Sequence, residues 1–395
     1  MKQHKFFSYA AAIGLAILIG FGFGFGFGGV GSGTNSTGIT AVKVMGDSLS
    51  DSGVFGSLVA GSGYGRIFSV QASAGGTTSI WTERLATLVG APQPCNFYTS
   101  THTSADRTLS TFTETTSCGS FAVGDGRINN RYPPGNATPY SIPAQIARAA
   151  SLGKFKSSDL LLIDGGGNDA ADLVEAFLDG VGSFTSVVTS TLTPVNTINT
   201  AVENSDFETA GTLYMQALAD EFYNSIKTDA LDNGATHVSV LNIPAITKTP
   251  RFQMMLAGVE SQSNAATRAT YEAMFNVWIK AFNDRLANKF SGDSRVVVVD
   301  FYSAFLDQMT NPSQYGLTNV TDPACPANAQ LGQDGLPEYN FETCTATSLS
   351  ATPGKASPDW WKTYAFSDGF HPTPNGYQLM SQLVARSLTQ AGWIK

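Results

Sequence analysis

Charged side chains are scarce in this sequence, and the positive ones are outnumbered. Only 14% of the 395 residues are charged, with 23 Lys and Arg against 31 Asp and Glu, which gives a formal net charge of −8. A nucleic-acid-binding protein needs clustered Lys and Arg, so we expect no nucleic-acid partner. The hydrophobic content of 42% is enough for a sizeable core, and we expect a globular monomer.

The N-terminus resembles an export signal. Lys2 and Lys5 precede an uncharged apolar run over residues 6–20, and no clear small-x-small cleavage site follows. We predict a signal peptide over residues 1–30 and a flexible Gly/Ser/Thr-rich linker over 31–40. A retained anchor is the alternative, because 6–30 exceeds the roughly 20 apolar residues that cross a bilayer. The protein is therefore expected to be secreted or periplasmic.

Cysteine is also rare, with only Cys95, Cys118, Cys325 and Cys344. No Cys-x-x-Cys motif or close Cys/His pair is present, which disfavours a zinc site, and we expect no metal and no cofactor. An even number of cysteines in an exported chain favours disulfides. Because the cysteines fall into two pairs that are close in sequence, we predict Cys95–Cys118 and Cys325–Cys344, each closing a long surface loop.

Short β-branched runs alternate with longer amphipathic runs after residue 40. The expected strands are 41–45, 120–123, 160–164, 237–241 and 296–299, and the expected helices are 81–88, 142–152, 213–230, 271–290 and 376–388. This alternation predicts one α/β domain over 41–395, with a parallel five-stranded sheet covered by helices on both faces. Segments 61–119 and 311–359 break the alternation, and we interpret them as excursions over the catalytic edge.

A candidate nucleophile, Ser48, directly follows the first predicted strand within Gly46-Asp47-Ser48-Leu49. The carboxyl ends of strands are where open α/β sheets usually carry their chemistry. A second copy of the tripeptide, Gly292-Asp293-Ser294, precedes a strand instead, so we interpret it as a turn. A serine hydroxyl also needs a base within hydrogen-bonding reach.

Only four histidines can supply that base, so it is found by elimination. His4 lies in the signal, His237 lies in a predicted strand, and His102 lies in the first excursion without a fixed acidic partner. His371 remains, three residues after Asp368 on a short loop before the last predicted helix. This spacing lets the carboxylate hold one imidazole nitrogen while the other faces the serine.

Two further strand ends offer donors for an oxyanion hole. Gly124 presents a backbone N–H without a side chain, and Asn168 presents an amide. The glycine run before Asn168 lacks the Gly-x-x-x-x-Gly-Lys pattern of phosphate-binding loops. The Gly-x-Ser-x-Gly elbow is also absent, which disfavours the α/β-hydrolase fold.

Together these motifs resemble, in order, the four blocks of the SGNH or GDSL-type hydrolases, and further stretches resemble the bacterial secreted lipase/phospholipase-like branch. The blocks are Gly46-Asp47-Ser48-Leu49, Gly124, Gly166-Gly167-Asn168-Asp169 and Asp368-Gly369-Phe370-His371-Pro372. One departure is Gly124-Asp125, where many relatives have Gly-Gly. Some relatives carry a C-terminal membrane barrel, and because this chain ends soon after its last predicted helix, none is expected here.

The resemblance implies a flavodoxin-like three-layer α/β/α sandwich and ester hydrolysis. Ser48 would be the nucleophile, His371 the general base and Asp368 its orienter. The Ser48 N–H, the Gly124 N–H and the Asn168 side chain would form the oxyanion hole. We therefore expect a secreted serine hydrolase that cleaves acyl esters or lipids through an acyl-enzyme.

Other functions stay open on the same scaffold. Acyl transfer to a sterol or sugar hydroxyl and deacetylation of a polysaccharide would use the same residues, and a non-catalytic surface or binding protein is a further alternative. Specificity should depend on the two excursions, whose aromatic residues could line a pocket or serve only as packing: Phe68, Trp81, Phe97, Tyr98 and Tyr315.

Overall fold

A parallel β-sheet forms the centre of the structure. Its strands follow the order β1-β4-β5-β6 and comprise Ala41–Met45, Asp159–Ile163, Val238–Leu241 and Val296–Val299. The computed structural model describes residues 38–56, 68–72, 78–100, 111–132, 135–190, 196–332, 334–339, 341 and 343–395. The predicted signal peptide, most of the linker and His102 lie outside the described residues.

The predicted fifth strand, 120–123, is present only in part. It runs parallel to the outer edge of β1, where the Phe121 N–H donates to Val44 O at 2.7 Å and the Val123 N–H donates to Gly46 O at 3.2 Å. The other edge of this segment bonds to the loop at Cys95, so it makes isolated bridges instead of a strand ladder. The described sheet therefore has four strands rather than five, although the segment keeps the order of a flavodoxin-like winding.

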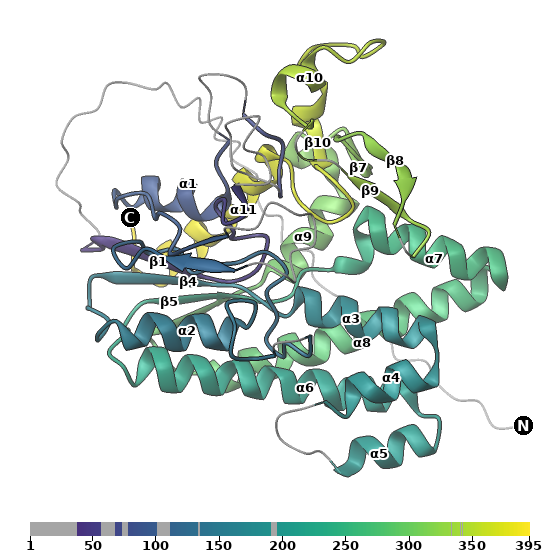
Figure 1. Ribbon diagram of the computed structural model, residues 1–395, viewed down its shortest axis with the longest axis horizontal. Coiled ribbons are helices and arrows are strands. Elements are labelled where there is room, and N and C mark those ends of the chain that lie inside the picture. The colour runs from purple at the N-terminus through teal and green to yellow at the C-terminus, as the bar shows by residue number, and fades with distance from the viewer. Residues whose placement is uncertain are drawn as a thin grey trace, which may run out of the picture. The chain divides into compact units, whose positions relative to one another are not determined.

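Helices cover both faces of the sheet, because alternate side chains of each buried strand point to opposite faces. Leu160 and Leu162 pack on the face covered by α1 (Trp81–Leu88), α9 (Phe301–Thr310) and α11 (Pro374–Gln390). Leu161 and Ile163 pack on the face covered by α2 (Ile142–Ser151), α6 (Phe207–Ser225) and α8 (Ala265–Phe290). Figure 1 shows the resulting three layers, which confirm the predicted α/β/α sandwich.

Two predicted helices begin earlier in the structure than in the prediction. Helix α6 begins after Asp206, whose side chain accepts the Thr209 N–H at 3.1 Å, and α8 begins after Asn264, which accepts the Thr267 N–H at 2.9 Å. In their first turns only Phe207 is a large apolar residue, so these turns lack the repeated apolar spacing on which the prediction depended. The prediction missed α9 and four further helices: α3 (Gly167–Asp179), α4 (Val181–Val188), α5 (Asn196–Glu203) and α7 (Pro250–Gln262).

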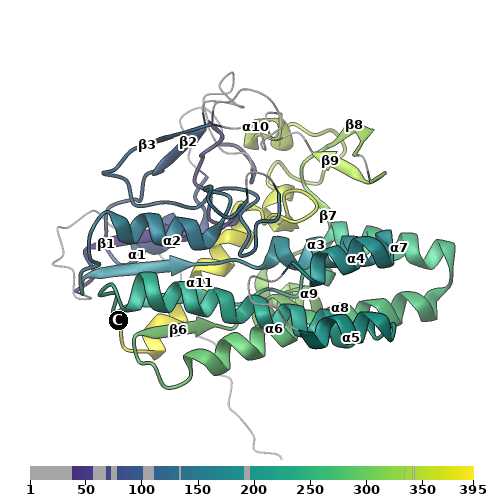
Figure 2. The same cartoon turned by 60° about the horizontal axis from the view of Figure 1, so that its bottom comes forward.

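The excursions contain more regular structure than predicted (Figure 2). In the first, β2 (Tyr98–Ser100) pairs antiparallel with β3 (Phe112–Glu114). The second contains α10 (Ala346–Ser350) and the hairpin of β8 (Ala327–Leu331) with β9 (Pro337–Tyr339). It also contains β7 (Asn319–Pro323), which pairs in parallel with β10 (Tyr364–Phe366), a strand just beyond the excursion.

Disulfides join Cys95 to Cys118 and Cys325 to Cys344, the pairing predicted from the sequence. The second disulfide closes residues 325–344, which include β8 and β9. We call this segment the hairpin loop.

Candidate active site

The predicted nucleophile lies in a tightly held turn at the carboxyl end of β1. The Gly46 N–H donates to Gln145 Oε1 at 2.8 Å, and Gln145 Nε2 donates back to Gly46 O at 3.0 Å. A Cβ at position 46 would collide with the Asp164 carboxylate, so only glycine fits there. The Asp47 side chain accepts the Leu49 N–H at 3.0 Å. These contacts fix the backbone on both sides of Ser48.

Ser48, His371 and Asp368 lie in one hydrogen-bonded line. The Ser48 Oγ is 2.7 Å from His371 Nε2, and His371 Nδ1 is 2.7 Å from Asp368 Oδ2. The other carboxylate oxygen of Asp368 accepts the Phe370 N–H at 2.8 Å and the His371 N–H at 2.6 Å. The structure therefore brings Ser48 together with two residues that lie 320 or more positions later in the sequence. The geometry is suited to proton transfer from the serine.

Asp368 and His371 each stabilise the charged form of the other. Burial acts to raise the pKa of Asp368, but the charge of His371 and the hydrogen bonds from His371 and two backbone amides outweigh burial and lower it. Burial acts to lower the pKa of His371, but the charge and hydrogen bond of Asp368 hold it above the ordinary value of 6.5. Asp47 and Asp125 add smaller effects in the same direction. The imidazole is therefore a stronger base than a free histidine.

The loop that carries His371 is anchored at both ends. The Ser367 N–H donates to His371 O at 2.7 Å, and the Arg251 N–H at the start of α7 donates to Gly369 O at 3.0 Å. Thr373 caps α11 by accepting the Gly376 N–H at 3.2 Å. Pro374, which follows Thr373, fits this arrangement, since proline suits the first turn of a helix. The base is consequently held in place by α7, β10 and α11.

Only part of the expected oxyanion hole faces the nucleophile. The Ser48 N–H has no partner among the described residues. Asn168 lies in the first turn of α3, where its Nδ2 donates one hydrogen to Gly126 O at 2.9 Å and keeps a second hydrogen. The Gly124 N–H instead donates to the buried Asp51 Oδ2 at 2.8 Å. In this conformation Gly124 is therefore not available as the donor that the sequence suggested.

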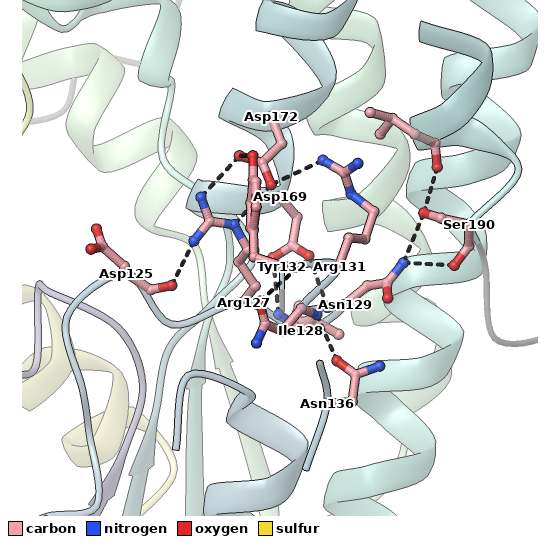
Figure 3. A network of polar contacts seen from close by, with 12 residues as sticks. Asp125, Arg127, Ile128, Asn129, Arg131, Tyr132, Asn136, Asp169, Asp172 and Ser190 are labelled. Carbon is pink, nitrogen blue, oxygen red and sulfur yellow. Dashed lines mark hydrogen bonds and ion pairs between the residues drawn. The ribbon is translucent and has the colours of Figure 1, made fainter. Parts of the chain in front are cut away.

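A network of polar contacts holds α3 against the loop after Gly124 (Figure 3). Asp169 accepts the Ile128 N–H at 3.0 Å and the Asn129 N–H at 2.9 Å, and burial raises its pKa to about 6. Arg127 makes a two-pronged ion pair with Asp172 at 2.8 and 2.9 Å. Through these contacts the network fixes Asn168 beside the Gly126 carbonyl.

The nucleophile opens into a cavity of about 590 Å³. One side is apolar and comes from α7, α9 and the loops before them and before α11; its residues are Ile246, Phe252, Phe301, Phe305 and Phe370. The hairpin loop supplies another wall, with Asn328, Pro337, Glu338, Tyr339 and Phe341. A site of this size and lining suits a mostly apolar small molecule.

Of the aromatic residues considered from the sequence, only Phe68 lines this cavity. Its ring centroid lies 5.0 Å from that of His371. Trp81, Phe97 and Tyr98 are buried as packing residues, and Tyr315 bonds to Asp307 on α9. For these four residues the structure favours the alternative that they serve as packing and do not line the cavity.

Several site residues were missed by sequence reasoning. Gln145 and Arg251 belong to no motif. Gln145 contacts Gly46, which is 99 positions away, and Arg251 contacts Gly369, which is 118 positions away. Arg251 lines the cavity and forms an ion pair with Asp334 in the hairpin loop. For Asp47 and Asp164 the sequence did offer a signal, because these two acidic residues follow two adjacent strands.

The remaining sequence candidates lie elsewhere. His237 directly precedes β5, and its ring contacts Trp393 with centroids 5.0 Å apart. The second Gly-Asp-Ser forms a turn before β6, with the Val296 N–H donating to Asp293 O at 3.0 Å. Within the described ranges no three His, Cys, Asp or Glu side chains gather as a metal site. No described helix combines the length and the apolar character that a bilayer crossing requires.

Comparison with known proteins gives one family. The model of the GDSL-like lipase/acylhydrolase family matches residues 42–384. The GDSL esterase/lipase EXL2 of Arabidopsis thaliana is 29% identical over 154 residues, which are 38% of this chain and 35% of that protein. A second GDSL esterase/lipase of that plant is 24% identical over 174 residues, 42% of each chain. The matched stretches thus span less than half the length of these relatives.

Proposed function

Because the chain belongs to the GDSL-like lipase/acylhydrolase family, we propose that it hydrolyses carboxylic acyl esters through Ser48. The observation that carries this proposal is the line of hydrogen bonds from Ser48 through His371 to Asp368, at 2.7 Å in both steps. A serine that is paired with a base, and a base that is held by a carboxylate, form the arrangement that acyl transfer to a hydroxyl requires.

In the proposed reaction, His371 Nε2 takes the Ser48 proton as Oγ attacks the ester carbonyl. The tetrahedral oxyanion receives hydrogen bonds from the Ser48 N–H and the free hydrogen of Asn168 Nδ2. The imidazolium, stabilised by Asp368, then protonates the leaving alcohol and an acyl-enzyme remains. Water activated by His371 attacks that ester and releases the acid. Gly124 would add a third donor only if its N–H left Asp51.

The apolar side of the cavity supports an acyl chain as the group bound next to Ser48. Phe252 on α7 and Phe301 and Phe305 on α9 line that side. We therefore propose acyl esters or lipids as the substrate class. Acyltransferase and polysaccharide deacetylase activities use the same chemistry and differ in the acceptor or the acyl group.

The test is turnover of nitrophenyl esters of short, medium and long acyl chains by the wild type, Ser48→Ala and Ser294→Ala. Ser294 is the matched control, because it lies in the same tripeptide outside the site. We expect Ser48→Ala to lose at least about 10³-fold in kcat and Ser294→Ala to retain activity. Equal turnover by the two variants would refute the assignment. An added alcohol acceptor separates transfer from hydrolysis by its ester product.

We also propose that the protein is exported. The basic and apolar N-terminus supports this, and so do the two disulfides, because such bonds persist in oxidising compartments. N-terminal sequencing of the protein recovered outside the cytoplasm would identify the cleavage site. Recovery of the intact N-terminus in the membrane fraction would instead favour the retained anchor.

A further inference from the structure

Two buried acidic side chains lie beside the turn that carries the nucleophile. Asp47 follows β1 and Asp164 follows β4, the neighbouring strand, so both are at the same edge of the sheet. Asp47 is 4% exposed and Asp164 is 3% exposed, and both line the cavity that contains Ser48. The proposed reaction assigns neither of them a role.

The hydrogen bonds of Asp164 leave one oxygen unexplained. Its Oδ1 accepts the Ser50 hydroxyl, which in turn accepts Trp81 Nε1–H at 3.1 Å. Its Oδ2 is fully buried and has no donor within the described part of the chain. The Asp47 side chain lies within hydrogen-bonding reach of the Asp164 carboxyl group. Two ionised carboxylates only accept, so this contact requires a proton on one of them.

The surroundings decide which of the two carries the proton. Burial raises the pKa of Asp47 as well. However, Asp47 accepts the Leu49 N–H, lies near the positive N-terminal end of α3 and is attracted by the charge of His371, and each of these favours an ionised carboxylate. Within the described part of the chain, the contacts of the Asp164 carboxyl group come from Ser50, the Gly46 backbone and Asp47, and none of these is a cation. Burial and the charge of Asp47 raise the pKa of Asp164 well above its ordinary value.

We propose that Asp164 stays protonated at neutral pH and donates its O–H to Asp47, so that the pair holds one negative charge behind Ser48. Asp164 is then a positioning residue that keeps Asp47 ionised and oriented. This proposal rests on the proposed roles of Ser48 and His371. Asp47 would act on His371 together with Asp368 and Asp125, favouring the imidazolium that forms when Ser48 attacks.

The test compares Asp164→Asn, Asp164→Ala and Asp47→Asn. An asparagine has the shape of a protonated aspartic acid and can donate Nδ2–H to Asp47, whereas alanine cannot. We measure the His371 pKa by NMR titration of its ring protons and, separately, the acid limb of kcat/KM. We expect Asp164→Asn to keep this pKa within about 0.3 and Asp47→Asn to lower it by about 1. Asp164→Ala should lose activity about 10-fold or more, as expected for a misoriented site.

If Asp164 were ionised in the wild type, Asp164→Asn would remove a charge and lower the His371 pKa as Asp47→Asn does, which would overturn the proposal. Infrared difference spectra of the wild type against Asp164→Asn provide a direct readout that does not need a folded alanine variant. Loss of the carbonyl band of a protonated carboxyl group at neutral pH supports the proposal, and loss of a carboxylate band refutes it. Neither spectroscopic result depends on ester turnover, so failure of the proposed function would be seen separately.

Discussion

Replacing Gln145 with alanine should destabilise the protein and disturb the nucleophile together. Gln145 is fully buried on α2, and its amide bonds the N–H and the carbonyl of Gly46, two residues before Ser48. The same amide donates to Pro139 O at 2.7 Å. It is therefore a cross-link between α2, the loop before it and the turn that carries the nucleophile.

The size of the effect follows from the groups that lose their partners. In Gln145→Ala, Gly46 O still accepts the Val123 N–H at 3.2 Å. The Gly46 N–H and Pro139 O are then the two groups that have no hydrogen-bond partner among the described residues. A buried polar group without a hydrogen bond costs about 1–3 kcal/mol. We expect Gln145→Ala to lower the free energy of unfolding by about 3 kcal/mol, a large part of the roughly 5–15 kcal/mol typical of a folded domain.

Urea unfolding measures this loss, with an unchanged m-value expected if the unfolded state is not affected. Gln93 is the matched control, because its exposed amide donates to Glu83 O and to Thr87 Oγ1 in contact with solvent. Gln93→Ala should cost no more than about 0.5 kcal/mol. Under conditions where Gln145→Ala is folded, its kcat should fall about 10-fold or more because the turn shifts. Equal losses of stability in the two variants would refute this reasoning.

Three further predictions concern pH and the disulfides. Since the pKa of His371 is held above 6.5, the acid limb of kcat/KM should have its midpoint above that value; a midpoint at or below it would contradict the assignment of the base. The pKa of Asp169 is raised from 3.8 to about 6, so the folded state binds this proton more tightly than the unfolded state. Stability should therefore fall as pH rises between those values, by about 3 kcal/mol relative to Asp169→Asn in denaturation series. Cys344→Ser should raise KM by freeing the cavity wall, whereas Cys118→Ser should lower stability by about 3 kcal/mol with little change in KM.

The sequence was sufficient to predict the residues at strand ends. A nucleophile after β1, an amide after β4 and an Asp-x-x-His loop are local patterns, and a parallel sheet brings strand ends to one edge whatever lies between them. Elimination among four histidines then left His371. The layers of the sandwich followed from the period of apolar residues for the same reason, because each strand or helix reports its own buried face.

The sequence could not predict contacts made by residues without a motif. Gln145 looks like an ordinary helical residue, and only the packing of α2 under β1 brings its amide to Gly46. The hydrogen bond from the Gly124 N–H to Asp51 could not be predicted for the same reason, because it joins two residues that are 73 positions apart in the sequence. The fifth strand was overpredicted because apolar character does not reveal that the outer edge of 120–123 bonds to a disulfide loop.

The division between strand ends and excursions suggests how specificity and chemistry are separated in this site. Ser48, Asn168 and their supports are fixed by the sheet and by α2 and α3, which do not depend on the hairpin loop. The wall formed by Pro337, Tyr339 and Phe341 depends on that loop and on the disulfide at its base. A change in the loop should therefore alter which acyl groups are accepted while the Ser48–His371 contact is preserved. Reaction of Cys344→Ser with a fluorophosphonate, at the wild-type rate but with altered ester preference, would show this separation; loss of labelling would show that the loop also supports the base.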